Sequence, residues 1–178
     1  LVVGLGGIGL SAILGARAAG ATQIIAADLN PDKRALALSL GANHSIDTAK
    51  SDALEELMDI TGGGVDKSVE FAGAIPALEF AFQATKRGGT TVTAALPHPN
   101  ARLQLSPVML VGQEKSLKGS YLGSCAPTRD IRAYINLYKS GRLPIEKLIT
   151  HKLSLDQINE GFERLAKGNA IRQVILFD

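Results

Sequence analysis

The sequence predicts an α/β fold, a doubly wound parallel sheet with helices on both faces and a C-terminal helix-strand extension. Short apolar runs alternate with longer helix-like patterns, which is the arrangement of successive βαβ units. The runs are almost continuously apolar, as from Ile24 to Ala27, and this favours strands covered on both faces. Glycines such as Gly20 and Gly41 follow the helix-like patterns, as expected at helix ends.

The elements of the sheet can be taken in chain order. Asn30 and Pro31 resemble a helix N-cap followed by proline in the first turn. Glycine-rich turns at 62–64 and 88–89 precede the fourth and fifth strands. We expect strands at residues 1–4, 23–28, 44–47, 67–71, 90–95 and 116–121, and helices at 9–19, 31–40, 52–60, 75–85 and 107–112.

The pattern changes after Ser124, where the tail is not another βαβ unit of equal weight. A helix is predicted at 130–139, followed by a break in "SGRLP". Tyr134 and Tyr138 are four residues apart on one face of this helix, and we expect them to pack. A second helix is predicted at 154–167, with Ser154 and Gln157 spaced as in a capping box, and a last strand at 171–177.

Composition limits the classes of partner. The net charge of +2 implies no strong attraction to nucleic acid or to a membrane surface, and no apolar run is long enough to span a bilayer. We expect no signal peptide. The single cysteine, Cys125, excludes a disulfide framework and a cysteine-based zinc site within this chain, and it favours the cytoplasm. We expect Cys125 to be buried or half-buried.

The stretch "VVGLGGIGLS" carries the strongest functional signal. Gly4, Gly6 and Gly9 form a G-x-G-x-x-G motif between a strand and a helix. In a dinucleotide site the first glycine allows the tight turn, the second lets the backbone approach a pyrophosphate, and the third lets helix and strand pack closely. The start of the helix then favours the phosphate anion.

Asp28 strengthens this interpretation, because it ends the second predicted strand at the expected distance from the motif. A carboxylate there can accept hydrogen bonds from both ribose hydroxyls of an adenosine. It would also repel a 2′-phosphate, so the sequence favours NAD over NADP.

Four separated motifs resemble the zinc-type, medium-chain alcohol dehydrogenases, in their coenzyme domain and C-terminal segment. The motifs are "VVGLGGIGLSAILGARAAGA", "AADLNPDK", "GGGVDKSVEFAG" and "LITHKLSLDQINEGFERLAKGNAIRQVILF". The resemblance implies a Rossmann domain that binds NAD at 1–124, with its first strand truncated. It also implies a closing helix and linker at 125–150, and a segment at 151–178 that packs on a catalytic domain absent from this chain.

The resemblance also implies the cofactor-binding residues. They would hold the pyrophosphate, the adenosine ribose, the adenine and the nicotinamide carboxamide. In chain order they are Gly4, Gly6, Gly7, Ile8, Gly9, Asp28, Lys33, Phe71, Ala72, Ala94, Ala95, Leu96, Ser120, Tyr121, Leu122 and Arg172.

In that family, hydride passes from an alcohol to NAD while a catalytic zinc stabilises the alkoxide. The resemblance places the zinc ligands in the missing domain, so we expect no catalytic residue and no metal ligand in this chain. The alcohol or aldehyde substrate would be bound by the parent protein. We expect the isolated chain to bind NAD weakly and to be inactive, as a fragment that begins inside the first strand.

Two alternatives remain open from the residues. One is a zinc-free, NADPH-dependent quinone or enoyl reductase domain, against which Asp28 argues. The other is a methyltransferase that binds S-adenosylmethionine, against which Gly6-Gly7 and the long last segment argue. The strand 116–121 is expected at the edge of the sheet, and it predicts a homodimer in which two such strands pair.

Overall fold

The computed structural model describes residues 1–177. In chain order its elements are β1 (Val2–Val3), α1 (Gly7–Ala18), β2 (Ile25–Asp28), α2 (Pro31–Leu40), β3 (His44–Asp47), α3 (Ala53–Thr61), β4 (Val65–Glu70), α4 (Ile75–Ala84), β5 (Thr85–Thr93), α5 (Pro107–Gly112), β6 (Ser116–Gly119), η1 (Leu122–Ser124), α6 (Pro127–Lys139), η2 (Ile145–Leu148), β7 (Ile149–Leu153), η3 (Leu155–Gln157), α7 (Ile158–Ala166) and β8 (Arg172–Ile175).

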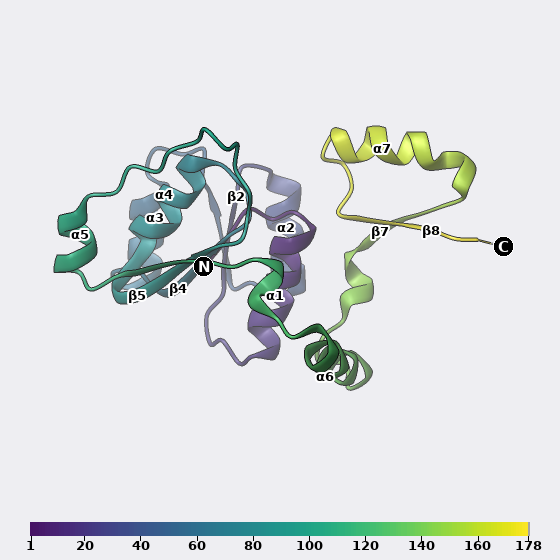
Figure 1. The fold of residues 1–178 in the computed structure, drawn as a ribbon, viewed down its shortest axis with the longest axis horizontal. Coiled ribbons are helices and arrows are strands. Elements are labelled where there is room, and N and C mark those ends of the chain that lie inside the picture. The colour runs from purple at the N-terminus through teal and green to yellow at the C-terminus, as the bar shows by residue number, and fades with distance from the viewer. Residues whose placement is uncertain (178) are drawn as a thin grey trace.

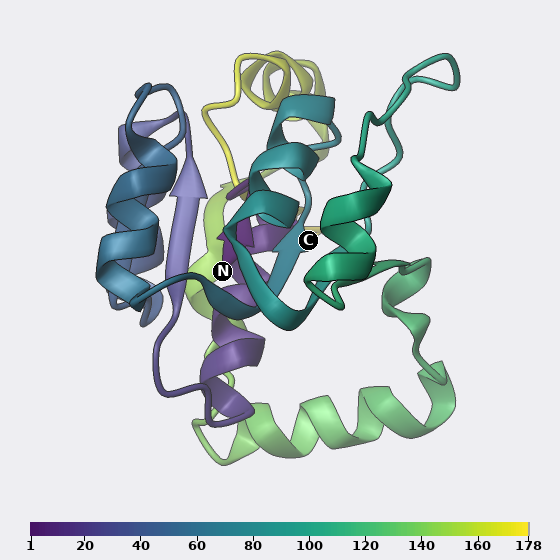
Figure 2. The same ribbon diagram turned by 90° about the vertical axis from the view of Figure 1, so that its left-hand side faces the viewer.

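The predicted doubly wound sheet is confirmed. Six strands lie in the order β3-β2-β1-β4-β5-β6, and each neighbouring pair is parallel. The order reverses direction at β1, so helices that follow the strands cover both faces of the sheet (Figures 1 and 2). In a sheet of this kind ligands bind at the carboxyl ends of the strands, next to the point of reversal.

Two apolar clusters lie on the opposite faces of the sheet. Because side chains alternate along a strand, Val2 and Ala26 belong to one cluster and Val3 and Ala27 to the other. The first cluster packs against α1 and α2 through Leu10, Ile13, Leu14, Ala37 and Leu40. The second packs against α3 and α4 through Ala53, Leu57, Ala81 and Ala84.

A second, smaller sheet lies apart from the first, beside α7 (Figure 1). It consists of β7 and β8, which pair in parallel. The sequence predicted β8 but not β7, because Ile149–Leu153 alternates poorly and follows the turn η2 directly. The predicted helix at 154–167 is divided into η3 and α7. The backbone N–H of Ser154 donates to Oε1 of Gln157 at 3.1 Å, as in the predicted capping box.

Three local expectations need correction. β5 begins at Thr85, earlier than predicted, because a register shift between Val65 and Lys67 lets pairing with β4 start before the glycine turn. Cys125 is exposed, whereas burial was expected. Tyr134 and Tyr138 were expected to pack, but they are 51% and 45% exposed on α6, which lies largely outside the main body (Figure 2).

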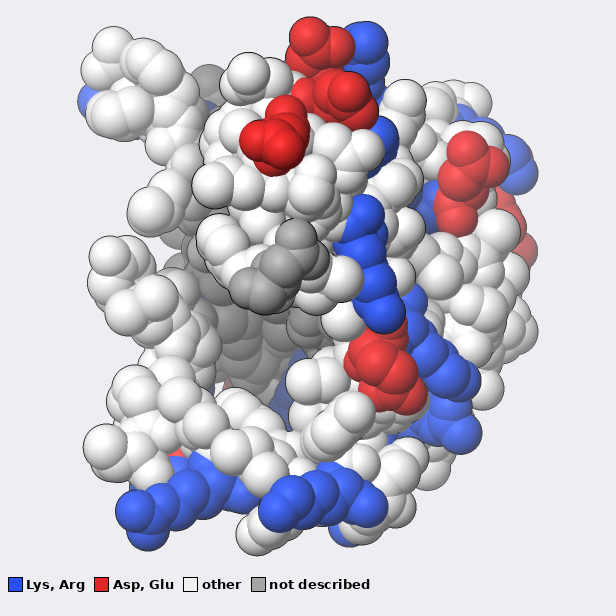
Figure 3. Space-filling view, turned by 90° about the vertical axis from the view of Figure 1, so that its right-hand side faces the viewer, with Lys and Arg blue, Asp and Glu red and all other residues white. Residues whose placement is uncertain are grey.

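The face that carries α7 and β8 has a mixed surface. Lysine, arginine, aspartate and glutamate side chains lie interspersed along one side of it, and a broad adjoining area is uncharged (Figure 3). Exposed apolar side chains on these elements and just after them are Phe162, Leu165, Leu176 and Phe177. Within residues 1–177, none of the helices combines the length and apolarity that crossing a bilayer requires.

Candidate functional site

The glycine turn joins β1 to α1, and two of its glycines are required by packing. Gly4 has φ +86°, and a Cβ there would lie 2.6 Å from the backbone nitrogen of Ala72. A Cβ on Gly9 would overlap the carbonyl oxygen of Gly4. Both contacts are with backbone, which cannot yield easily. The turn is therefore packed tightly against the residues after β4 on one side and the start of α1 on the other.

The other two glycines lie on the open side of the turn. A Cβ built on Gly6 meets no described heavy atom within 4 Å, so this position faces free space. A Cβ on Gly7 would lie 3.5 Å from Nη2 of Arg172. α1 begins at Gly7, and the N–H groups of its first turn point outward from the carboxyl edge of the sheet. A polyanion approaching Gly6 would meet these groups and the Arg172 guanidinium together.

Asp28 is bonded directly to the glycine turn. Its Oδ2 accepts a hydrogen bond from the backbone N–H of Leu5 at 2.6 Å, and its Oδ1 accepts one from the N–H of Asn30 at 2.9 Å. The carboxylate is half-buried. Each carboxylate oxygen has a further lone pair, so both can still accept from a ligand hydroxyl. The predicted pairing of the motif with an acid is present, and the acid is held rigidly.

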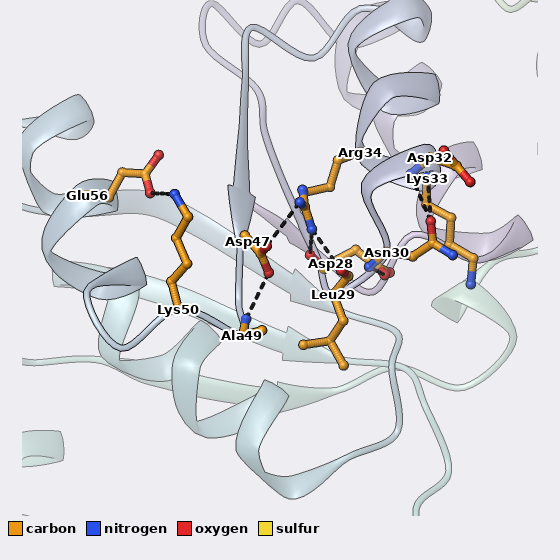
Figure 4. Close-up of polar contacts among 10 residues, drawn as sticks. All are labelled: Asp28, Leu29, Asn30, Asp32, Lys33, Arg34, Asp47, Ala49, Lys50 and Glu56. Carbon is orange, nitrogen blue, oxygen red and sulfur yellow. Dashed lines mark hydrogen bonds and ion pairs between the residues drawn. The ribbon is translucent and has the colours of Figure 1, made fainter.

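The turn after Asp28 leads into α2. The side chain of Asn30 caps this helix, because its Oδ1 accepts from the N–H groups of Asp32 at 2.8 Å and of Lys33 at 3.2 Å (Figure 4). Lys33 also lines a hollow of about 300 Å³. The hollow lies between the first turns of α2 on one side and Thr150 of β7 with the turn 168–171 before β8 on the other. Lys33 therefore lies in the first turn of the helix that follows Asp28.

The ends of β4 and β5 form the next part of the edge. Phe71 and Ala72 follow β4, and Ala72 touches the glycine turn. Buried Glu70 ties the two strand ends together. One of its carboxylate oxygens accepts from the N–H of Gly73 and the other from Oγ1 of Thr93, each at 2.7 Å. Sequence reasoning missed Glu70, because its role depends on which strands are neighbours.

The remaining expected residues follow β5 and β6. Ala94 and Ala95 are half-buried after β5, and Leu96 is exposed. The N–H of Ser120 donates to the carbonyl of Thr93 at 2.9 Å, which brings the residue after β6 beside the end of β5. Tyr121 and Leu122 are exposed next to it. These expected residues thus share the carboxyl edge with the glycine turn.

Arg172 is the one expected residue that comes from the second sheet. It begins β8, yet its guanidinium lies beside Gly7. The carbonyl oxygen of Ile171 is also close, at 3.2 Å from a Cβ placed on Gly7. Ile171 packs against the apolar cluster of α1 and α2. This contact places the start of β8 against the glycine turn, so the exposed side chain of Arg172 begins next to the open side of the turn.

A second hollow, larger than the one beside Lys33, does not coincide with this edge. It has a volume of about 770 Å³ and lies at the amino ends of the strands, between the turn after α1 and the glycines 62–64. Ligands of open α/β sheets bind at the opposite edge, so we assign no role to it. Within residues 1–177, no group of three or more histidine, cysteine, aspartate or glutamate side chains is arranged to hold a metal ion.

Comparisons with known proteins agree with this geometry. Residues 7–140 match the family described as zinc-binding dehydrogenase. Alcohol dehydrogenase 1 of Cenchrus americanus is 38% identical over 98% of this chain and 46% of its own length. The chain therefore spans about half the length of the curated relatives it matches. These relatives support neither of the two alternatives, the zinc-free reductase and the methyltransferase.

Solved structures of dehydrogenases have the same fold as this chain. The structure of benzyl alcohol dehydrogenase from Acinetobacter calcoaceticus has a TM-score of 0.93 at 30% identity, over 98% of this chain and 48% of that one. A zinc-binding dehydrogenase of Sinorhizobium meliloti 1021, solved with NADP bound, has a TM-score of 0.87 at 27% identity, over 97% of this chain and 50% of that one.

Proposed function

The chain belongs to the zinc-binding dehydrogenase family, and from that premise we propose that it is the NAD-binding half of a zinc-dependent alcohol dehydrogenase. The observation that carries the proposal is the convergence of three separate segments on one turn. Asp28, at the end of β2, accepts a hydrogen bond from Leu5 of the turn, and the guanidinium of Arg172, at the start of β8, lies beside Gly7. Gly6 has free space beside it. A glycine turn and an acid after the second strand are the groups that a dinucleotide site uses, and a guanidinium suits the pyrophosphate.

The residues present fit NAD. The N–H groups at the start of α1 and the guanidinium of Arg172 would bind the pyrophosphate. The fixed carboxylate of Asp28 would accept hydrogen bonds from the adenosine ribose, and it disfavours the 2′-phosphate of NADP. Because one structurally similar dehydrogenase is bound to NADP, the choice of NAD depends on residues around Asp28 and not on the fold.

When bound, NAD would supply the hydride acceptor for oxidation of an alcohol. The chain's own part is to hold the nicotinamide end at the carboxyl ends of β5 and β6, where backbone groups near Ala94 and Ser120 lie side by side. Rigid placement of the reacting carbon is a large part of what such a domain contributes. We propose that the zinc and the alcohol or aldehyde substrate are bound by the rest of the protein.

Calorimetric titration of the 178-residue chain with NADH tests the proposal. We expect saturable binding, and we expect Arg172→Ala to weaken it about tenfold, because a charge-assisted hydrogen bond to phosphate is lost. The matched control is Arg87→Ala, since Arg87 is exposed at the amino end of the sheet and its loss should leave the affinity unchanged. Absence of NADH binding to the folded wild-type chain would refute the proposal.

We also propose a homodimer formed through β6. This strand occupies an edge of the main sheet, and an unpaired edge is suited to pairing with a second copy. Val108 and Val111 of α5, the helix before β6, are 79% and 76% exposed, which supports an apolar contact beside the strand. Sedimentation analysis at high concentration checks this, and a monomeric mass there would contradict it.

The division of the chain is proposed on the same basis. We propose that residues 1–124 bind NAD, that 125–150 close and link the domain, and that 151–178 pack on the catalytic domain. The exposed Phe162 and Leu165 of α7 support a partner for the last segment. A cytoplasmic location is proposed from the single cysteine.

A further inference from the structure

Two aspartates occupy neighbouring strand ends at the adenosine side of the proposed site. Asp28 and Asp47 are the last residues of β2 and β3, and they are register partners in the parallel pair. Adjacent strands of a sheet are about 4.8 Å apart, so the two backbone positions are neighbours at the carboxyl edge. Asp28 was expected to face the ribose. Asp47 was not singled out by any sequence motif.

Arg34 connects these two strand ends. Its Nη1 donates to the carbonyl oxygens of Asp28 at 2.8 Å and of Leu29 at 2.9 Å, and its Nη2 donates to Oδ2 of Asp47 at 3.1 Å (Figure 4). The side chains of Arg34 and Asp47 are only 15% and 26% exposed. The guanidinium is therefore held from three directions and largely removed from solvent.

Asp47 is itself held in place. Its Oδ1 accepts from the backbone N–H of Ala49 at 3.0 Å, so the carboxylate is oriented by its own following turn. One oxygen is thus fixed by the backbone while the other binds Arg34. The ion pair is built into the ends of β2 and β3, and it does not depend on the free rotation of two surface side chains.

The position of this guanidinium matters for cofactor choice. In dinucleotide-binding folds an arginine near the end of the second strand accommodates the 2′-phosphate of NADP. Arg34 lies in that neighbourhood, but both hydrogens of Nη1 are directed at carbonyls and Nη2 is directed at Asp47. A phosphate would have to compete with a carboxylate that is already oriented and paired.

We propose that Asp47 is a second specificity-determining residue, which engages Arg34 and so withholds it from a 2′-phosphate, while its charge adds to that of Asp28. Preference for NAD then rests on two carboxylates with different tasks. Asp28 binds the ribose and repels the phosphate, and Asp47 neutralises the cation that would otherwise attract it. This inference rests on the proposed function and deepens it.

The test compares dissociation constants for NADH and NADPH, measured by calorimetry on the 178-residue chain. Wild type is expected to prefer NADH. In Asp47→Asn we expect NADPH affinity to rise about tenfold, because one negative charge is removed and one positive charge is released close to the phosphate. We expect NADH affinity in this variant to stay within about twofold, since NADH carries no phosphate on that ribose.

Further variants separate charge from structure. Asp47→Glu keeps the charge and should retain the wild-type preference. The double variant Asp47→Asn with Arg34→Gln should lose the gain in NADPH affinity, because the released guanidinium is gone. Asp66→Asn is the matched control, since it also breaks an ion pair, with Lys86 at 2.6 Å, but at the amino end of β4. It should leave the NADH-to-NADPH ratio unchanged.

Because Asp28 also repels the 2′-phosphate and so lowers NADPH affinity, the same comparison is repeated in the Asp28→Asn background. Circular dichroism and thermal unfolding verify that each variant is folded. If wild type binds NADH but Asp47→Asn leaves the ratio unchanged, or weakens both nucleotides equally, the inference is overturned while the proposed function stands. If folded wild type binds neither nucleotide, the proposed function itself fails.

Discussion

The backbone N–H of Leu5 donates a 2.6 Å hydrogen bond to Oδ2 of Asp28, which joins the glycine turn to the end of the neighbouring strand. Leu5 is fully buried, so its N–H cannot turn to solvent for another partner. The bond therefore makes the phosphate and ribose parts of the proposed site one rigid unit. A change at Asp28 is expected to affect both the binding of nucleotide and the stability of the fold.

Asp28→Asn tests this double role. Hydrogen bonds to a charged acceptor are stronger than those to an amide, so we expect NADH affinity to fall about tenfold. The amide has one acceptor oxygen for two backbone N–H groups, and we expect the free energy of unfolding to fall by about 1 kcal/mol. Asp59→Asn, at an exposed position of α3, is the control that should change neither quantity. An unchanged NADH affinity in the Asp28 variant would contradict the assigned role.

Gly9 and Gly15 of α1 have opposite surroundings and give a second prediction. Gly9→Ala would force a Cβ into the carbonyl oxygen of Gly4, and we expect it to destabilise the chain by more than about 2 kcal/mol and to abolish NADH binding. Gly15→Ala, in the same helix, meets no described heavy atom within 4 Å. It should stabilise the helix by about 0.5–1 kcal/mol. Denaturant titration measures both, and equal effects would contradict the packing argument.

Lys115 gives a prediction about pH. The residue is 7% exposed, and its Nζ lies 5.0 Å from the ring centroid of Phe82 and donates to the carbonyls of Phe82 and Gln83 in the last turn of α4. Burial lowers the pKa of Lys115 below its usual value. The folded state therefore loses this proton before the unfolded state does. The contribution of Lys115 to stability should rise with pH between the folded pKa and the usual 10.5.

Lys115→Met isolates that contribution. At pH 7 we expect it to lower the free energy of unfolding by about 1 kcal/mol, because two helix-end carbonyls lose their partner. The stability difference between wild type and the variant should grow toward pH 10.5. Lys139→Met, at an exposed lysine of α6, serves as the control for replacing a surface lysine by methionine. A stability difference that shrinks as pH rises would contradict the predicted direction of this pH dependence.

A buried cluster of three hydroxyls between β4, α4 and β5 gives the last prediction. Oγ of Ser68 lies 2.7 Å from Oγ1 of Thr85, and Oγ1 of Thr91 lies within 3.1 Å of both. Thr91→Val keeps the volume but removes a shared partner, so we expect a loss of about 1–2 kcal/mol in denaturant unfolding. Thr90→Val, on the opposite side of β5, should cost less than about 0.5 kcal/mol. Equal losses of unfolding free energy in the two variants would mean that the hydrogen bonds of the cluster add nothing to stability.

The main sheet was predictable because its signals are local. Apolar runs, the N-cap Asn30 and the glycines at helix ends each report on a few neighbouring residues, and the observed order of strands follows from repeated βαβ units. β7 was missed because Ile149–Leu153 is stabilised by pairing with β8, more than twenty residues further along the chain. Tyr134 and Tyr138 share a helix face as predicted, but spacing does not reveal whether a partner covers that face.

The site was predictable where a motif has a fixed spacing, and not where a contact depends on strand register. Gly4, Gly6, Gly9 and Asp28 follow such a spacing. Arg34 and Asp47 are thirteen residues apart and meet only because β2 and β3 pair with their last residues in register. Glu70 and Thr93 meet for the same reason between β4 and β5. No spacing rule links either pair.

The opposite orientation of Val2 and Val3 has a consequence for protein engineering. These residues anchor in separate apolar clusters and are followed at once by Gly4, whose backbone is fixed against Ala72. One extra residue inserted between Val3 and Gly4 would have to bulge out of a central strand or exchange the two valines between the faces. Grafting the glycine turn onto another scaffold should therefore include both valines, because the strand before the turn determines which face of the sheet each residue of the turn meets.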